Sequence, residues 1–315
     1  MRMKFSFLSL LIVGALFVPA IAFAQQDEDV RGAFMTSRPK ASAKDSGTKT
    51  TPTARPSRRH PKPSGTSSSG TNGNGATSST GNTSTKLNVP RLGLGLTLFM
   101  RDSNGLAVRT DPSHDFHKGD HVRFLVETNT DGYLYLFNTT DNGAPVMIYP
   151  DAELDEAGNY FQAHVPFEIP SSLASEERLK WLTFDEHGGA EKLYFVFTRE
   201  PLTAVPIEDD LIAFCRENSS KCPWTPADDV WAQIRKELSE PTQTAKVTGL
   251  GNAQTSTERQ AATRGIGLNR DDPEPSLIML SASTSKNTLV VAVDLIHKSV
   301  GMLVNPKEQG FNHKE

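Results

Sequence analysis

Apolar and polar residues alternate along the chain from Leu92 onward, in short runs that end in turn residues. A leucine stands at every second position of 92–98, and a similar alternation follows over 121–128. A period of two is typical of a strand with one buried face. The pattern therefore predicts a strand over 92–99 and another over 121–128.

Three other runs are apolar at consecutive positions, namely Tyr133–Phe137, Lys192–Arg199 and Leu289–Ile296. A strand that is apolar on both faces is covered on both, so these runs belong in the interior of a layered fold. The aromatic residues of the first run could form an open stacking platform for a ligand. The intervening leucines leave no polar face, which favours core aromatics.

Turn residues join several of these runs. Asp141-Asn142-Gly143 is typical of a tight hairpin, because Asn and Gly tolerate positive φ, and Val146–Tyr149 is the predicted return strand. Near the C-terminus, Ser276–Ser281 and Leu289–Ile296 are separated by Ser-Lys-Asn. We expect these two runs to form a final hairpin.

Helix signals are confined to Ile207–Glu217 and Thr225–Leu238. In the second segment Thr225 is the expected N-cap, with Pro226 at the first helical position and acidic residues in the first turn. Residues 240–272 have no strong pattern and are expected to form a long loop.

These elements predict a mainly β fold, an antiparallel β-sandwich or open barrel with a small two-helix insertion. The expected single domain covers 88–300, and 301–315 form a tail. Within the domain, the helical insertion occupies 206–239 and the closing strands occupy 276–297.

The first 24 residues have the parts of a secretory signal peptide: a cationic start, an apolar run, and Ala22-Phe23-Ala24 at its end. The alternative is a retained membrane anchor, because the apolar run approaches spanning length. We expect cleavage near Ala24. The mature protein would then be exported, to the periplasm or the cell exterior, with no remaining membrane span.

Residues 25–87 differ in composition from the rest of the chain. The stretch from Arg38 to Lys62 is rich in Pro, Lys and Arg, and 64–85 consist almost entirely of Ser, Thr, Gly and Asn. Such a segment buries too little apolar surface to offset its conformational entropy, so 25–87 are expected to be a disordered tether. Deleting 38–85 is then expected to leave the melting temperature nearly unchanged.

The charge is divided unevenly along the chain. The 33 Lys and Arg residues against 37 Asp and Glu give a net charge of −4. Without Arg2 and Lys4 this becomes −6, and without the +7 stretch from Arg38 to Lys62 it becomes −13. The basic stretch either serves solubility or contacts a polyanion of the cell envelope. The near-neutral balance argues against a nucleic-acid binder.

The chain has two cysteines, Cys215 and Cys222, near the two predicted helices. In an exported protein the expected state is a disulfide, and their spacing differs from the Cys-x-x-Cys of redox enzymes.

The densest group of potential metal ligands is His114, His117 and His121, with Asp115 and Asp120 between them. Histidine and carboxylate suit zinc, but the spacing straddles a turn and no H-E-x-x-H helix is present. Solvated loop histidines are the favoured interpretation. The sequence also has no G-x-S-x-G motif and no complete dinucleotide loop, so neither a catalytic residue nor a cofactor is assigned.

One segment, about 118–202, resembles a bacterial family of domains of unknown function, DUF4384. The resemblance rests on the order and spacing of short motifs: Gly119-Asp120, Asp131–Asn138, Gly143, Ile148-Tyr149-Pro150, Phe167-x-Ile169-Pro170, Gly189-x-Glu191 and Tyr194-x-x-Phe197. Members of that family are exported or attached to peptidases and kinases, which implies an accessory module without defined catalytic residues.

Together these observations favour an exported, non-catalytic β-sandwich module that binds a protein partner or an envelope component. The alternative is a periplasmic metal-dependent or hydrolytic enzyme that uses the region of His114, His117 and His121.

Overall fold

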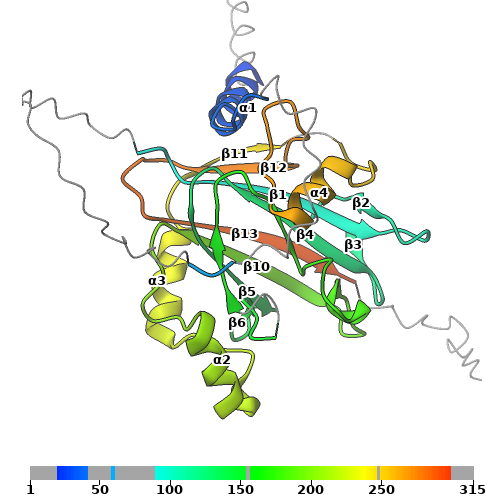
Figure 1. Cartoon of the computed structure of the whole chain (residues 1–315), viewed down its shortest axis with the longest axis vertical. Coiled ribbons are helices and arrows are strands. Elements are labelled where there is room, and N and C mark those ends of the chain that lie inside the picture. Colours follow the sequence, from blue (N-terminus) through cyan, green and yellow to red (C-terminus); the bar gives the residue numbers. More distant parts are fainter. Residues whose placement is uncertain (1–19, 42–57, 61–88, 154–156, 247–248, 299–315) are drawn as a thin grey trace, which may run out of the picture.

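The computed structural model describes residues 20–41, 58–60, 89–153, 157–246 and 249–298 (Figure 1). The fold is mainly β. It has two sheets, one a curled half-barrel, that are mostly antiparallel, and four short α-helices in the described part of the chain. This confirms the predicted fold class.

The first sheet has seven strands, all paired in antiparallel fashion. They are β1 (Gly93–Arg101), β2 (Ala107–Arg109), β4 (His121–Thr128), β8 (Phe167–Ile169), β9 (Leu182–Thr183), β11 (Thr242–Lys246) and β12 (Leu277–Ser281). The order is β11-β12-β1-β4-β8, with β2 added to β1 and β9 added to β4.

The second sheet has six strands in the order β3-β13-β10-β5-β6, with β7 added to β5. They are β3 (Asp115–Phe116), β5 (Gly132–Thr140), β6 (Val146–Tyr149), β7 (Tyr160–Phe161), β10 (Gly189–Thr198) and β13 (Thr288–His297). The pairing of β3 with β13 is parallel, and the others are antiparallel.

Helices lie outside the two sheets (Figure 1). They are α1 (Ala20–Met35), α2 (Glu208–Glu217), α3 (Asp228–Leu238) and α4 (Ser256–Arg264), with short 3-10 turns at Glu177–Leu179 and Ser219–Lys221.

The main core lies between the sheets and is built by alternation along the strands. Leu134 and Leu136 of β5 are fully buried in it together with Phe195 of β10. The intervening aromatic residues, Tyr133 and Tyr135 among them, lie in a second core beneath α2 and α3. Strands β5 and β10, predicted to be apolar on both faces, are therefore covered on both, as a strand inside a layered fold requires.

The helical insertion is closed by the disulfide between Cys215 and Cys222, whose Cα atoms are 5.2 Å apart. This confirms the predicted pairing. The predicted start of the second helix is wrong, because α3 begins at Asp228 rather than Pro226. The amide of Met147 donates to the carbonyl of Trp224, which holds the preceding residues in an extended connection.

The predicted C-terminal hairpin is also wrong. Strand β12 pairs with β1 and β11 in the first sheet, whereas β13 pairs with β10 in the second. Each of the two strands completes a different layer, and the short connection between them crosses from one sheet to the other.

Part of the predicted tether is packed on the domain. Val30, Phe34 and Met35 of α1 are buried against β11 and β12, in a core with Ile278 and Leu280. The composition of this segment predicted a disordered tether rather than a helix, because its few apolar residues lie on only one side of α1. No described helix has the length and apolar character to cross a membrane. Most of the predicted signal peptide and the Gly/Ser-rich half of the tether lie outside the described residues.

Candidate functional site

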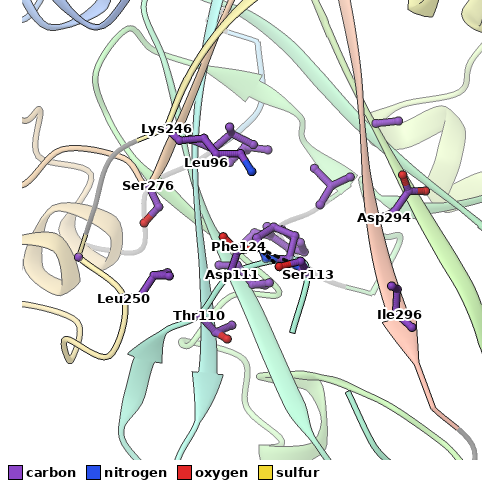
Figure 2. Close-up of a pocket in the computed structure, with 16 residues that line it drawn as sticks. Leu96, Thr110, Asp111, Ser113, Phe124, Lys246, Leu250, Ser276, Asp294 and Ile296 are labelled. Carbon is purple, nitrogen blue, oxygen red and sulfur yellow. Dashed lines mark hydrogen bonds between the residues drawn. The ribbon is translucent and has the colours of Figure 1, made fainter. Parts of the chain in front are cut away.

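A cleft of about 730 Å³ opens where the edge of the second sheet meets the first (Figure 2). Its volume lies within the range of roughly 300–1,000 Å³ that is typical of sites for small molecules or peptide side chains. It is lined by residues of β1, β4, β11, β12 and β13 and by the loops at 110–113 and 249–250.

The floor of the cleft is apolar and comes from the core faces of the strands. Leu96 and Leu98 of β1 point inward because they share one face of a period-two strand, and Phe124 of β4 lies beside them. The Phe124 ring is fixed by an edge-to-face contact with Phe195, with ring centroids 5.1 Å apart. This floor is therefore preformed by the core.

The unpaired edge of β13 runs along the cleft. Val293 faces the main core, whereas Ala292 and Asp294 belong to the opposite face of the strand, yet all three line the cleft. Residues from both faces of one strand meet in one cavity only where the strand edge itself is open. Among the described strands, β3 pairs with this edge only at Ile296 and His297.

Two exposed apolar side chains flank the mouth of the cleft. Leu250 is 55 % exposed and Ile296 is 47 % exposed, and both are lining residues (Figure 2). The sequence predicted that Ile296 is covered like its neighbours on β13, and the structure corrects this. It is uncovered because the described structure places no strand or helix over that end of the outer face.

Polar and charged groups form the rim. The hydroxyl and amide of Ser113 donate to Asp111 at 2.6 and 2.8 Å, which holds the pKa of Asp111 below its ordinary value. Lys246 stands on the rim from the end of β11, and Asp294 is paired with Lys192 at 3.2 Å. The rim thus presents both signs of charge around an apolar floor.

The three candidate metal ligands do not share one site. His114 contacts the ring of Phe116, His117 lies 3.9 Å from Asp120, and His121 bonds to the hydroxyl of Thr183 at 2.8 Å. Within the described ranges, no group of three or more His, Cys, Asp or Glu side chains could hold a metal ion. The structure therefore gives no geometric support to the metal-dependent alternative.

A buried charged cluster that the sequence did not reveal lies beneath the end of α1. The guanidinium of Arg38 donates to both carboxylate oxygens of Glu127, at 2.8 and 2.6 Å, and both side chains are almost completely buried. Burial alone would raise the pKa of Glu127, but hydrogen bonds from His164 and Arg38 outweigh it and lower this pKa.

The same cluster has the connectivity of a serine-histidine-acid triad. Ser37 Oγ is 3.0 Å from His164 Nε2, and His164 Nδ1 is 2.8 Å from Glu127 Oε1. The arrangement differs from an active nucleophile in two ways. The Ser37 hydroxyl donates to the carbonyl of Phe34 at 2.5 Å, and Arg38 neutralises the carboxylate. Ser37 lines neither the cleft along β13 nor a second cleft, of about 520 Å³, beside the disulfide. We therefore assign the cluster to anchoring the segment that follows α1.

Two arginines of the predicted polyanion-binding stretch are buried, which corrects that part of the expectation. Arg38 is 1 % exposed and Arg58 is 3 % exposed, so neither presents its charge to an external ligand. Both are held by protein groups instead: Arg38 by the carboxylate of Glu127, and Arg58 by the rings of Phe161 and Phe167.

Residues 115–201 match the family model of a domain of unknown function, DUF4384, which confirms the resemblance found in the sequence. Comparison with the curated proteins and with the solved structures gives no match. The matched segment contains the strands from β3 to β10 but neither β1 nor β13. Of the cleft residues, only Phe124 lies inside it, so the cleft is built largely by the flanking parts of this chain.

Proposed function

We propose that the protein is an exported, non-catalytic binding module, and that its cleft takes an extended apolar segment of a partner protein as an added strand on β13. The observation that carries this proposal is the open edge of β13 along the floor of an apolar cleft. In strand addition, main-chain hydrogen bonds give affinity and pockets beside the edge select alternate side chains.

The chemistry of the cleft fits this kind of ligand. The backbone edge of β13 offers donors and acceptors, while Leu96, Leu98 and Phe124 offer an apolar surface for side chains on one face of the added strand. Leu250 and Ile296 extend that surface to the mouth. A natural protein usually protects a strand edge of this kind, and an unprotected one beside an apolar cleft favours a binding role.

A peptide library displayed on phage and selected on the full chain tests the proposal. We expect enriched peptides to carry apolar residues at alternate positions and to lack proline between them, because proline cannot donate to a strand ladder. Replacing Leu250 and Ile296 with Ser should weaken the binding of these peptides at least about tenfold, since both side chains flank the mouth.

A matched control is available elsewhere on the surface. Leu106 and Leu173 are 48 % and 41 % exposed but do not line the cleft, so their double replacement by Ser should leave binding unchanged. Equal binding by both double variants, or enrichment of peptides without alternation, would overturn the proposal.

Export is the second part of the proposal and rests on the N-terminal sequence. N-terminal sequencing of the protein from the periplasmic or extracellular fraction of its own cells should begin near Gln25. Recovery of the uncleaved chain in the cytoplasm would remove this part while leaving the cleft proposal intact.

A further inference from the structure

Three residues of the predicted tether, Arg58–His60, are docked in a groove formed by β7 of the second sheet, β8 of the first sheet and the start of α2. Arg58 is the deepest of them and is only 3 % exposed. Its guanidinium carbon lies 4.7 Å from the ring centroid of Phe161 and 4.3 Å from that of Phe167. The two rings stand almost at right angles, and the guanidinium gains cation–π attraction from both while its Nη2 donates to the carbonyl of Pro166 at 3.4 Å. A group that combines ring contacts with several fixed N–H donors favours arginine over lysine at this position.

The backbone of the segment is recognised as well. The amide of Tyr160 donates to the carbonyl of Arg58 at 2.8 Å, so the segment lies beside β7 much like a short added strand. Gly158 makes this approach possible. A Cβ atom at 158 would lie 2.5 Å from the carbonyl carbon of Arg58 and 2.6 Å from its oxygen, which is closer than atoms pack.

The two following residues are held by carboxylates at the start of α2. The Arg59 guanidinium pairs with Asp209 at 2.8 Å, and the His60 amide donates to Glu208 at 2.6 Å. The His60 ring stacks on Tyr133 with ring centroids 5.8 Å apart and bonds to its hydroxyl. Each of the three residues thus meets a group suited to its own chemistry.

Arg58 packs on Phe161 and Phe167 of the main core, whereas the two residues after it are held outside the core by the start of α2. The segment contributes no strand to either sheet, so its release is a local opening that leaves the strand pairing in place. Its departure would expose the rings of Phe161 and Phe167, which favours refilling the slot with another arginine. Charge complementarity also favours binding of another basic segment, because the chain carries a net negative charge outside its own basic stretch.

We propose that this groove is an exchangeable recognition site for an extended Arg-Arg-His segment, and that in trans it takes Arg58–His60 of a second copy of the chain. A second copy of the chain is the proposed partner because its Arg58–His60 segment has the sequence that fits this groove. Exchange of identical segments between two copies gives a closed, symmetric dimer. In the wild-type chain, the resident segment competes with a segment from a second copy and has a high effective concentration because it is tethered. Exchange between copies can therefore be measured when a substitution prevents docking within one chain.

Two complementary variants of the full chain test this. Arg58→Ala leaves the groove intact but removes the arginine, whereas Gly158→Ala leaves the segment intact but blocks its own groove. We expect each variant alone to sediment as a monomer. Their mixture should form a heterodimer, in which the Arg58→Ala chain supplies the groove and the Gly158→Ala chain supplies the segment. Because a tethered segment docks at an effective concentration of about millimolar, the mixture is tested at protein concentrations up to that value.

A peptide corresponding to residues 54–62 provides a second measurement that does not depend on assembly. It should bind the Arg58→Ala chain at least about tenfold more tightly than the wild-type chain, in which the resident segment competes. Circular dichroism would verify that the variants are folded, and the same peptide with Ala at 58 is the control.

A mixture that remains monomeric, together with a peptide that does not bind the Arg58→Ala chain, would overturn the proposal. Equal binding of the control peptide would also overturn it, because recognition would then not depend on the arginine slot. Neither outcome affects the cleft on β13, which shares no lining residue with this groove.

Discussion

Replacing Arg38 with Met removes the cation of a fully buried ion pair and leaves its carboxylate in place. The Arg38 side chain is completely buried and donates to both oxygens of Glu127, and it also donates to three backbone carbonyls at 3.1 Å. Breaking such a pair from one side costs about 3–5 kcal/mol, because the remaining carboxylate stays buried with only the hydrogen bond to His164. That is a large part of a typical net stability of about 5–15 kcal/mol.

Arg31 of the same segment provides a matched control. It also bonds to a carboxylate through two nitrogens, those of Glu274 at 2.5 and 2.8 Å, but its side chain is 39 % exposed. An ion pair that solvent screens contributes only about 0–1 kcal/mol, so Arg31→Met should have a small effect. The two variants differ in burial and in the three backbone carbonyls that only Arg38 reaches.

Urea unfolding of the full oxidised chain, followed by tryptophan fluorescence, measures both effects. The double variant Arg38→Met/Glu127→Gln should be more stable than the sum of the single losses implies, because it removes both buried charges together. An Arg38→Met variant that loses no more stability than Arg31→Met would refute the reasoning. It would mean that the buried cluster does not anchor the segment after α1.

Three further predictions follow from the fold. Truncation after Asn287 removes β13 and its five buried apolar side chains, each contributing about 1.5–3 kcal/mol, so the product should be insoluble or unfolded. A soluble product with cooperative thermal unfolding would contradict this. The lowered pKa of Glu127 stabilises the fold above its unfolded pKa of about 4.3, and this stabilisation is lost as the pH falls through the folded pKa. In urea unfolding at decreasing pH, the wild-type chain should therefore lose more free energy of unfolding than the Glu127→Gln variant. Equal losses in the two chains would contradict this prediction. Replacing Cys215 and Cys222 with Ser should cost about 2–3 kcal/mol in thermal unfolding, and mass spectrometry of unreduced peptides should find them linked rather than free.

The strands were predictable because their local pattern and their environment agree. The run at Tyr133–Phe137 is apolar on both faces and is covered on both, and the Asp141-Asn142 turn has positive φ at both residues, as the hairpin requires. The hairpin expected between β12 and β13 failed because sequence proximity does not decide which sheet a strand joins. Strand β12 finds its partners in β1 and β11.

Helix α4 lies in the segment predicted to be a long loop, although the sequence marks both of its ends. Thr255 and Glu258 form a capping box at its start, and Gly265 ends it with a φ of 64°. Its weak apolar pattern hid it, since only Ala261 and Ala262 are its buried apolar residues. A capping pattern followed by glycine at this spacing predicts such a helix even without a stripe.

The candidate sites depend on contacts between distant parts of the chain, which no local pattern encodes. Arg38 pairs with Glu127, and Arg58 fills the slot between Phe161 and Phe167. In composition both arginines belong to a polar, basic stretch. Because deleting 38–85 empties two buried positions, we now expect the deletion to lower the melting temperature rather than leave it nearly unchanged.

Hydrogen exchange of β13, with and without a peptide selected for binding, tests the proposed strand addition most directly. The amides of β13 that face away from β10 should exchange more slowly in the complex, because each becomes a donor to the added strand. Strand β6, at the opposite edge of the same sheet, is the internal control and should not change. A peptide that binds tightly without slowing exchange in β13 would contradict the central claim.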